Sequence, residues 1–252
     1  MDYSLIFVIF IIMVCMFVIA VVTWLCHNNP NHIISLWNYC IKGECDKQDL
    51  YTINGIPSYQ NAWECSNKIA KEFHQLIHIN HNQILSEVSD AMKYYNKTSD
   101  EDNWNPIWIR FMGEWNGSSE RLPMLKQIAL LFPEVSNLYV SIFYPGTTLI
   151  EQKNTSRIFH RYHYGLKIPT DDVGLKIDGY NVKWKEREGY IWDDTLSHSA
   201  WNHTSEPRIV IFADIFRDLS VVNTIGSKFV YSLLKRNMYV KNHIQQETIM
   251  IN

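Results

Sequence analysis

The stretch LIEQKNTSRIFHRYHYGLKIP, residues 149–169, decides how this chain is expected to fold. Arg161 and His163 stand two residues apart in a run that is otherwise typical of a β-strand. Side chains two apart on a strand point to the same face, so this pair is predicted to share one face while His160 and Tyr162 point to the other. The stretch therefore predicts a strand that directs a cation and an imidazole toward a common space.

Similar short runs fill the second half of the chain. From Leu138 onward, LYVSIFYPG, GLKIDGYNVKWKE, GYIWDD, SHSAWNHT and RIVIFADIF are separated by Gly, Pro, Asn and Asp. Short strands with regular turn signals indicate a β-sandwich or barrel. The aromatic content of 13% fits a β-rich core. We therefore expect a β-rich α+β fold.

Helical patterns precede and follow these strands. Apolar residues recur at helical spacing within residues 61–95, and residues 122–135 suggest a second helix. Residues 96–118 between them are expected to form a loop, although they carry three tryptophans. The tail from Asn223 is expected to begin as a helix.

Composition limits the partners and the covalent chemistry. The formal net charge of -3 gives no electrostatic reason to expect nucleic acid as a partner. The five cysteines include no C-x-x-C pair, so a zinc cluster is not expected. A disulfide between Cys40 and Cys45, or between Cys45 and Cys65, is open in an oxidising compartment.

The N-terminus carries a long apolar segment. Residues 5–25 contain no charged side chain and are long enough to cross a hydrocarbon core of about 30 Å. A signal peptide has a shorter apolar region, of about 7–15 residues, behind a basic start, and here Asp2 is the only early charge. A retained single-pass membrane anchor is therefore expected.

These features predict the domain organisation. We expect an anchor at 1–27, a juxtamembrane stalk at 28–60, a catalytic-sized domain at 61–220 and a helical tail at 221–252. Four N-x-S/T sequons would allow a lumenal or extracellular position for the C-terminal domain. Their asparagines are Asn96, Asn116, Asn154 and Asn202.

Two further residues extend the site predicted around Arg161 and His163. His198 lies in WDDTLSHSAW, and Arg208 follows ten residues later at the start of RIVIFADIF. An arginine is costly to bury without an anionic partner, so a pocket for a carboxylate ligand is one reading. The other reading is that both arginines pair with acidic side chains of the chain itself, such as Asp193, Asp194 or Asp214.

Taken in order, these blocks resemble the aspartyl/asparaginyl β-hydroxylase family. The similar elements are a PGT turn in YVSIFYPGT, an R-x-H-x-G-L strand, a DD-x-x-x-H-x-x-W loop and a terminal R-hydrophobic-D strand, over roughly residues 104–219. The resemblance implies a double-stranded β-helix of the jelly-roll or cupin type with flanking helices. It also implies a 2-oxoglutarate/Fe(II)-dependent dioxygenase that hydroxylates Asp or Asn side chains of a polypeptide substrate. Animal members are type II membrane proteins, which suits the anchor, whereas related bacterial members act on lipid.

The resemblance also implies roles for particular residues. The positions that hold the 2-oxoglutarate carboxylates match Ser141, Arg161, His163 and Arg208. His198 matches the distal iron ligand, with a role in catalysis. The proximal iron-binding histidine of the family falls at Gln152, so the expected metal ligands are His198 and Gln152.

Gln152 leaves the iron site and the activity open. A neutral amide oxygen suits hard cations better than it replaces imidazole. Glu151 could replace Gln152 if a bulge of one residue turned it inward, and His160 is the poorer substitute because it should face away. Three readings follow: a dioxygenase with a rearranged iron site, a degenerate relative that binds 2-oxoglutarate without turnover, and a membrane-anchored protein that uses only the scaffold.

Overall fold

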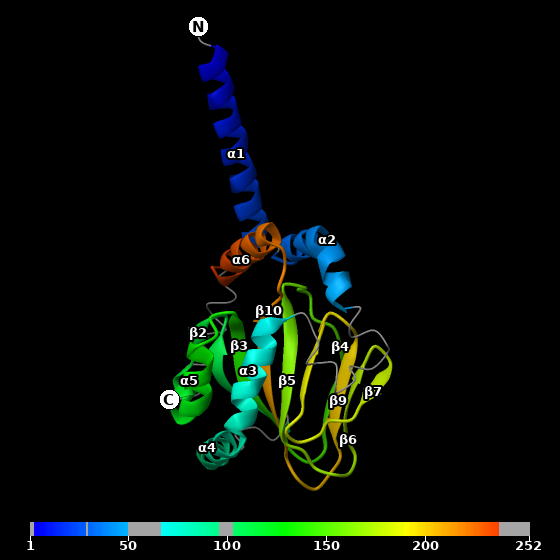
Figure 1. The fold of residues 1–252 in the computed structure, drawn as a ribbon. Helices are drawn as coiled ribbons and strands as arrows, with labels where there is room; N and C mark the ends of the chain where they lie inside the picture. The colour runs from blue at the N-terminus through cyan, green and yellow to red at the C-terminus, as the bar shows by residue number, and fades with distance from the viewer. Residues whose placement is uncertain (1–2, 29, 50–66, 96–102, 237–252) are drawn as a thin grey trace.

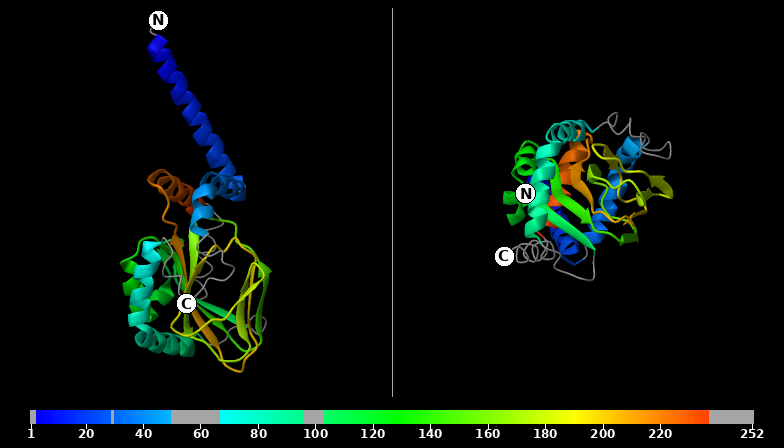
Figure 2. Two further views of the ribbon diagram at one scale, coloured as in Figure 1. Left: turned by 45° about the vertical axis from the view of Figure 1, so that its right-hand side comes forward. Right: turned by 90° about the horizontal axis from the view of Figure 1, so that it is seen from below.

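The protein is described by a computed structural model that covers residues 3–28, 30–49, 67–95 and 103–236. Its centre is two β-sheets that face each other (Figures 1 and 2). The larger sheet has the strand order β2-β1-β3-β10-β5-β8, and the smaller has the order β4-β9-β6-β7. Every strand pairing is antiparallel. This arrangement confirms the expected β-rich α+β class with a double-stranded β-helix.

The strands of the larger sheet are β1 Trp104–Phe111, β2 Glu114–Trp115, β3 Val135–Phe143, β5 Phe159–Lys167, β8 Gly189–Trp192 and β10 Arg208–Phe216. Those of the smaller sheet are β4 Thr147–Gln152, β6 Val173–Ile177, β7 Tyr180–Val182 and β9 His198–Asn202. Strands far apart in sequence are neighbours, because β10 lies between β3 and β5 and β9 lies between β4 and β6. This order interleaves the two halves of the β-region, which brings side chains from distant segments into the space between the sheets.

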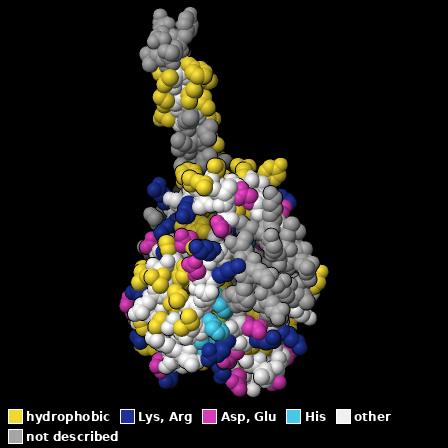
Figure 3. Space-filling model, in the orientation of Figure 1, with side chains coloured by type: hydrophobic (Ala, Val, Ile, Leu, Met, Phe, Trp, Pro, Cys, Tyr) yellow, Lys and Arg dark blue, Asp and Glu magenta, His cyan; other side chains and the backbone are white. Residues whose placement is uncertain are grey.

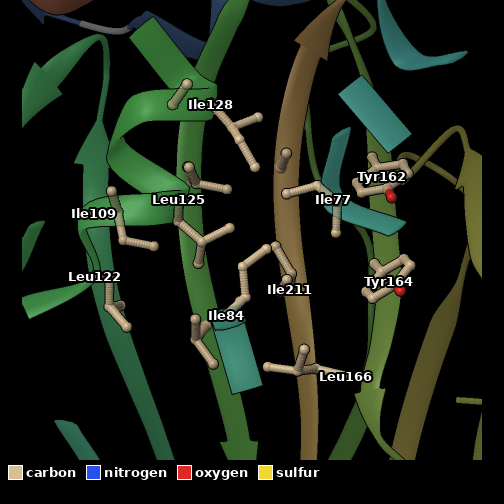
Figure 4. Packing of buried hydrophobic residues seen from close by; sticks show 14 of the residues in the cluster. Ile77, Ile84, Ile109, Leu122, Leu125, Ile128, Tyr162, Tyr164, Leu166 and Ile211 are labelled. Carbon is tan, nitrogen blue, oxygen red and sulfur yellow. The ribbon is translucent and has the colours of Figure 1, made fainter. Parts of the chain in front are cut away.

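Three helices cover the outer face of the larger sheet: α3 Lys68–Ile79, α4 His81–Tyr94 and α5 Pro123–Leu130. On α3 the buried residues Ala70, Phe73 and Ile77 recur at helical spacing and form one apolar stripe. Figure 4 shows Ile77 and Leu125 packed over Ile211 of β10. This apolar layer fixes the larger sheet from outside and leaves its other face to the smaller sheet.

Two helix predictions differ in extent from the structure. The helix expected over 61–95 is two helices within the described part, because Asn80 ends α3 and its side chain donates to the Leu76 carbonyl oxygen at 2.8 Å. The helix expected over 122–135 ends at Leu130, and Val135 already begins β3.

The expected loop at 96–118 is wrong for its described part, because residues 104–111 form β1. This strand was hard to foresee because Pro106 interrupts it, and proline lacks the N–H that a central strand needs. At Pro106 the strand pairs only with β3, since β2 pairs only with Arg110 and Phe111. Pro106 therefore sits on an edge, where proline is tolerated.

The segment expected to be a stalk is a helix against the domain over much of its length. Residues Pro30–Asp49 form α2, which packs against α6, Val221–Lys235. The indole Nε1 of Trp37 donates to Ser227 Oγ at 2.9 Å. The Trp37 ring lies so close to Gly226 that a Cβ there would come within 2.1 Å of it. Within the described residues, the segment predicted as a helical tail forms α6, and residues 237–252 lie outside them.

The first helix, α1, spans Tyr3–Asn28 and projects from the domain beside α2 and α6 (Figure 1). Within the described residues, no helix satisfies both the length and the apolarity needed to cross a membrane. The membrane anchor therefore stays a prediction.

The cysteines of α2 do not form the first of the two expected disulfides. Cys40, which is exposed, and Cys45, which is buried, are not joined by a disulfide. They point to different sides of one helix, which is incompatible with disulfide geometry. The second expected bridge involves Cys65, which lies outside the described residues.

Candidate functional site

A pocket lies between the two sheets and contains about 410 Å³ of empty space, part of it open to solvent. Six residues that the sequence singled out line it together: Ser141, Gln152, Arg161, His163, His198 and Arg208. They come from β3, β4, β5, β9 and β10, so both sheets contribute. The fold therefore brings all of these residues to one place.

Strand alternation on β5 works as the sequence predicted. Arg161 and His163 line the pocket, whereas Tyr162 belongs to the apolar layer beneath the helices. Gly165 continues the same strand, and a Cβ at this position would lie 2.2 Å from the Lys185 carbonyl oxygen. The glycine of the R-x-H-x-G-L pattern is therefore needed for the close approach of two backbone segments.

Arg208 is a buried cation without a partner. Its side chain is fully buried, and its guanidinium lies 3.7 Å from the ring centroid of Trp184 and 4.1 Å from that of Phe143. None of its three side-chain nitrogens has a hydrogen-bond partner among the described residues. Burial lowers the pKa of Arg208 well below its usual value. A guanidinium in this position is stabilised when an anion enters the pocket.

Arg161 is different, because two carboxylates already hold it. Its Nε lies 2.6 Å from Asp214 Oδ1, and its Nη2 lies 2.8 Å from Asp194 Oδ2. Burial raises the pKa of Asp194 to about 6, although Arg161 acts in the opposite direction. Of the two interpretations offered for the arginines, pairing with the chain's own acids therefore applies to Arg161. Binding of an external carboxylate applies to Arg208.

The neighbouring acid, Asp193, fixes the loop that leads to His198. Its Oδ2 lies 3.0 Å from Arg157 Nε and 2.8 Å from Arg217 Nη2. Both aspartates of the WDD sequence are therefore engaged by arginines. Neither aspartate lines the pocket, so both act on it through the arginines that they hold.

The pocket wall is rich in nitrogen atoms without partners. Seven buried side-chain nitrogens of pocket residues lack a hydrogen bond in the described part of the chain, and they belong to His163, Trp184, Trp192 and Arg208. Burial, with Arg161 and Arg208 nearby, lowers the pKa of His163 and keeps its ring neutral. Six of the seven carry hydrogen, because a neutral imidazole has one donor and one acceptor nitrogen. Buried polar groups are nearly always satisfied in folded proteins, so this excess of donors indicates a ligand with several acceptor oxygens.

Ser141 adds a hydroxyl to this wall. Its Oγ is fully buried and accepts a hydrogen bond from Trp104 Nε1 at 3.0 Å. The Ser141 O–H can therefore donate to a ligand oxygen. The wall tryptophans, Trp104, Trp184 and Trp192, were not singled out as site residues. The sequence signal that could have found them is the tryptophan in each of three strand-like runs, WNPIWIRF, NVKWKE and GYIW.

His198 and Gln152 stand opposite each other on β9 and β4. His198 Nδ1 lies 2.9 Å from the Leu196 carbonyl oxygen, and Nε2 lies 3.4 Å from Gln152 Nε2. The pairing of β4 with β9 shifts by one residue between Leu149 and Gln152. The expected bulge is thus present, but it places Gln152 opposite His198.

Glu151 and His160 are not turned toward His198. Glu151 is exposed and accepts a hydrogen bond from the Ser197 hydroxyl. His160 is buried beside Asn67, with Nδ1 3.5 Å from Asn67 Nδ2, on the face of β5 away from the pocket. In this conformation, neither side chain takes the place of the second histidine of a two-histidine iron site.

The oxo-acid and the metal that the resemblance implies fit this site unequally. The unpaired donors around Arg208 and His163 suit a dicarboxylate. Among the described residues, no three or more His, Cys, Asp or Glu side chains are arranged to hold a metal ion. One imidazole and one amide make a poorer set than the histidine and carboxylate ligands of non-haem iron sites. The donor set does not fit Fe(II).

The fold and the pocket together define a class. Two opposed antiparallel sheets of interleaved strand order are the architecture of the double-stranded β-helix proteins. The sequence profile of the aspartyl/asparaginyl beta-hydroxylase family matches residues 64–218, more than half of the chain. The chain belongs to this family.

Individual relatives are more distant. The chain is 34% identical over 89 residues to an ornithine lipid ester-linked acyl 2-hydroxylase of Rhizobium tropici, covering 34% of this chain and 32% of that protein. It is 23% identical over 199 residues to the human aspartyl/asparaginyl beta-hydroxylase, covering 73% of this chain and 25% of that protein. The chain thus spans a third or less of the length of these relatives.

A crystal structure of a 2OG-Fe(II) oxygenase family oxidoreductase from Burkholderia pseudomallei has a similar fold. Its TM-score is 0.40 at 8% identity, over 52% of this chain and 77% of that one.

Proposed function

We propose that this chain binds 2-oxoglutarate in the pocket between its sheets. The observation that carries the proposal is Arg208, a fully buried guanidinium with no partner among the described residues. Arg208 anchors one carboxylate of the ligand, and the Ser141 hydroxyl donates to it. His163 and the indole N–H groups of the wall face the remaining oxygens. Arg161 stays with Asp194 and Asp214 and supplies positive potential.

Two activities can be built on this pocket, and the first is that of the family. In that case the chain is a membrane-anchored dioxygenase that hydroxylates Asp or Asn side chains of a polypeptide. Family membership supports it, as does the relative named aspartyl/asparaginyl beta-hydroxylase. A second relative is named for an acyl group of an ornithine lipid, so the fold does not fix the substrate. This activity would require Fe(II), for which His198 and Gln152 would be the available residues.

The second activity is binding without turnover, as a degenerate relative that keeps the 2-oxoglutarate pocket. The contact between Gln152 and His198 favours it, because the donor set does not fit iron. On the geometry alone, this is the better supported of the two.

Succinate release distinguishes these activities. The full-length chain in detergent is given Fe(II), 2-oxoglutarate, oxygen and Asp- or Asn-containing peptides, with Arg208→Ala as the control. Hydroxylation predicts succinate well above that of the control. Binding without turnover predicts succinate at the control level in the native chain and its appearance in Gln152→His.

The predicted location is a single-pass membrane protein with its C-terminal domain lumenal or extracellular. The apolar N-terminal segment supports this, since large side chains such as Phe7, Phe10 and Met16 are exposed on α1. Of the described sequon asparagines, Asn154 is exposed, whereas Asn116 and Asn202 are buried. On the face in Figure 3, Lys and Arg are interspersed with Asp and Glu.

The location is tested in a cell that glycosylates secreted proteins. We expect the chain to resist carbonate extraction, and its glycosylation-dependent mobility shift to shrink in Asn154→Gln. A chain that carbonate extracts contradicts the anchor. A chain without any glycosylation contradicts the lumenal or extracellular orientation.

A further inference from the structure

The hydrogen bond at Nδ1 fixes which nitrogen of His198 is free to bind a ligand. His198 Nδ1 lies 2.9 Å from the carbonyl oxygen of Leu196, which can only accept. Nδ1 therefore carries the hydrogen, and Nε2 of the neutral ring carries the lone pair. Metal-binding histidines use this same orientation, so Nε2 is the atom that a metal ion would need.

That lone pair already has a partner. Gln152 Nε2 lies 3.4 Å from His198 Nε2, and an amide nitrogen can only donate. The Gln152 amide therefore donates a hydrogen bond to the atom that a metal ion would need. The one-residue shift between β4 and β9 produces this contact, since unshifted pairing would place Glu151 opposite His198.

The pocket does not need a metal ion to compensate the charge of an oxo-acid. Arg208 is fully buried, has no hydrogen-bond partner among the described residues, and lies beside the rings of Trp184 and Phe143. The two indole N–H groups of Trp184 and Trp192 also lack partners in the described residues. These donors are present in the chain itself and point to the binding of carboxylate oxygens.

We propose that this pocket takes up 2-oxoglutarate without a metal ion, with the Gln152 amide occupying the metal-binding nitrogen of His198. The inference rests on the proposed 2-oxoglutarate binding and departs from the metal-dependent binding that the family implies. It makes Gln152 the residue that separates ligand binding from metal binding in this chain.

Calorimetry tests the proposal on the full-length chain in detergent. 2-Oxoglutarate is titrated once in EDTA and once with Mn(II), a divalent ion that is stable in air. We expect dissociation constants that agree within about twofold, since a tenfold change corresponds to 1.4 kcal/mol. A tenfold or greater loss of affinity in EDTA overturns the proposal but leaves 2-oxoglutarate binding intact. Absence of binding in both conditions overturns the proposed function as well.

A second measurement follows the metal directly. The electron paramagnetic resonance signal of free Mn(II) is recorded with and without the chain, before any oxo-acid is added. We expect the native chain to leave the signal unchanged. Gln152→His should reduce it and should make 2-oxoglutarate affinity respond to Mn(II) by at least tenfold.

The matched control is Lys153→His, which adds an imidazole one residue further along. Lys153 is exposed and does not stand opposite His198. We expect it to behave as the native chain does. Loss of the Mn(II) signal with the native chain or with Lys153→His overturns the proposal. If Gln152→His does not fold, the native chain in EDTA and in Mn(II) still decides.

Discussion

The two faces of β5 present polar atoms in opposite states of satisfaction. Toward the helices, the Tyr162 hydroxyl lies 2.9 Å from His74 Nδ1, and the Tyr164 hydroxyl lies 3.0 Å from His81 Nδ1 (Figure 4 shows both hydroxyls). Toward the pocket, neither nitrogen of His163 has a partner among the described residues. The tyrosine hydroxyls on the helix side of β5 are therefore satisfied, whereas the His163 ring on its pocket side is not satisfied by the described residues.

The same contrast separates the two pocket arginines. Arg161 is held by Asp194 and Asp214, whereas Arg208 lies beside two aromatic rings and has no hydrogen-bond partner among the described residues. Burial alone is therefore a poor guide to a ligand site. What marks the site is burial without a hydrogen-bond partner, because a folded chain rarely leaves such groups unsatisfied.

The largest expected change in the free energy of unfolding comes from breaking the ion pair between Arg161 and Asp214. Asp214→Ala removes one of the two carboxylates that hold Arg161. Breaking a buried ion pair costs about 3–5 kcal/mol of stability. Urea unfolding followed by circular dichroism measures the loss. Asp171→Ala, at an exposed acid, is the control and should change stability by no more than about 0.5 kcal/mol. A loss below about 1 kcal/mol for Asp214→Ala would contradict the importance of the pair.

Replacing Arg208 should raise the free energy of unfolding rather than lower it. Arg208→Met keeps the length of the side chain and removes a buried charge, so the ligand-free protein should gain about 1–4 kcal/mol while 2-oxoglutarate binding is lost. Arg217→Met is the matched control, since Arg217 is equally buried but bonded to Asp193. It should destabilise the chain. Equal losses in both variants would show that the two arginines do not differ.

Acid should lower the stability of the folded chain through His74, which contacts Tyr162 on the helix side of β5. Burial lowers the pKa of His74 to about 3 from an unfolded value of 6.5. Below pH 6.5 the unfolded chain binds a proton that the folded chain does not, so stability falls as the pH falls toward 3. We expect about 2 kcal/mol between pH 6.5 and pH 5 from this residue.

Urea unfolding at a series of pH values measures this slope. Burial also lowers the pKa of His163 and His198, which adds in the same direction. His74→Gln should flatten the slope relative to the native chain. An unchanged slope would remove His74 as a cause.

The smallest expected effect compares the two faces of β5 directly. Tyr164→Phe removes the partner of His81 Nδ1 and should cost about 1 kcal/mol. His163→Leu breaks no hydrogen bond among the described residues and should cost less. Thermal unfolding of both variants checks the order, and a larger loss for His163→Leu would reverse the comparison.

Local pattern in the sequence was enough for much of the fold. The alternation around Arg161 and His163 predicted their shared face because strand geometry depends only on neighbouring residues. Segments whose state depends on distant contacts were predicted less well. Residues 104–111 form a strand because β3 pairs with them, and residues 30–49 contact the domain as a helix because Trp37 packs against Gly226.

The candidate site divides along the same line. Strand alternation in the sequence predicted that Arg161 and His163 share a face, and the family resemblance added Ser141 and Gln152 to the same site. Only the tertiary structure decided which of them are free to act. Asp214 lies 53 residues from Arg161 and reaches it because β5 and β10 are neighbours in register. The one-residue shift in β4 likewise sets Gln152 against His198, and such pairings form only when strands distant in sequence meet.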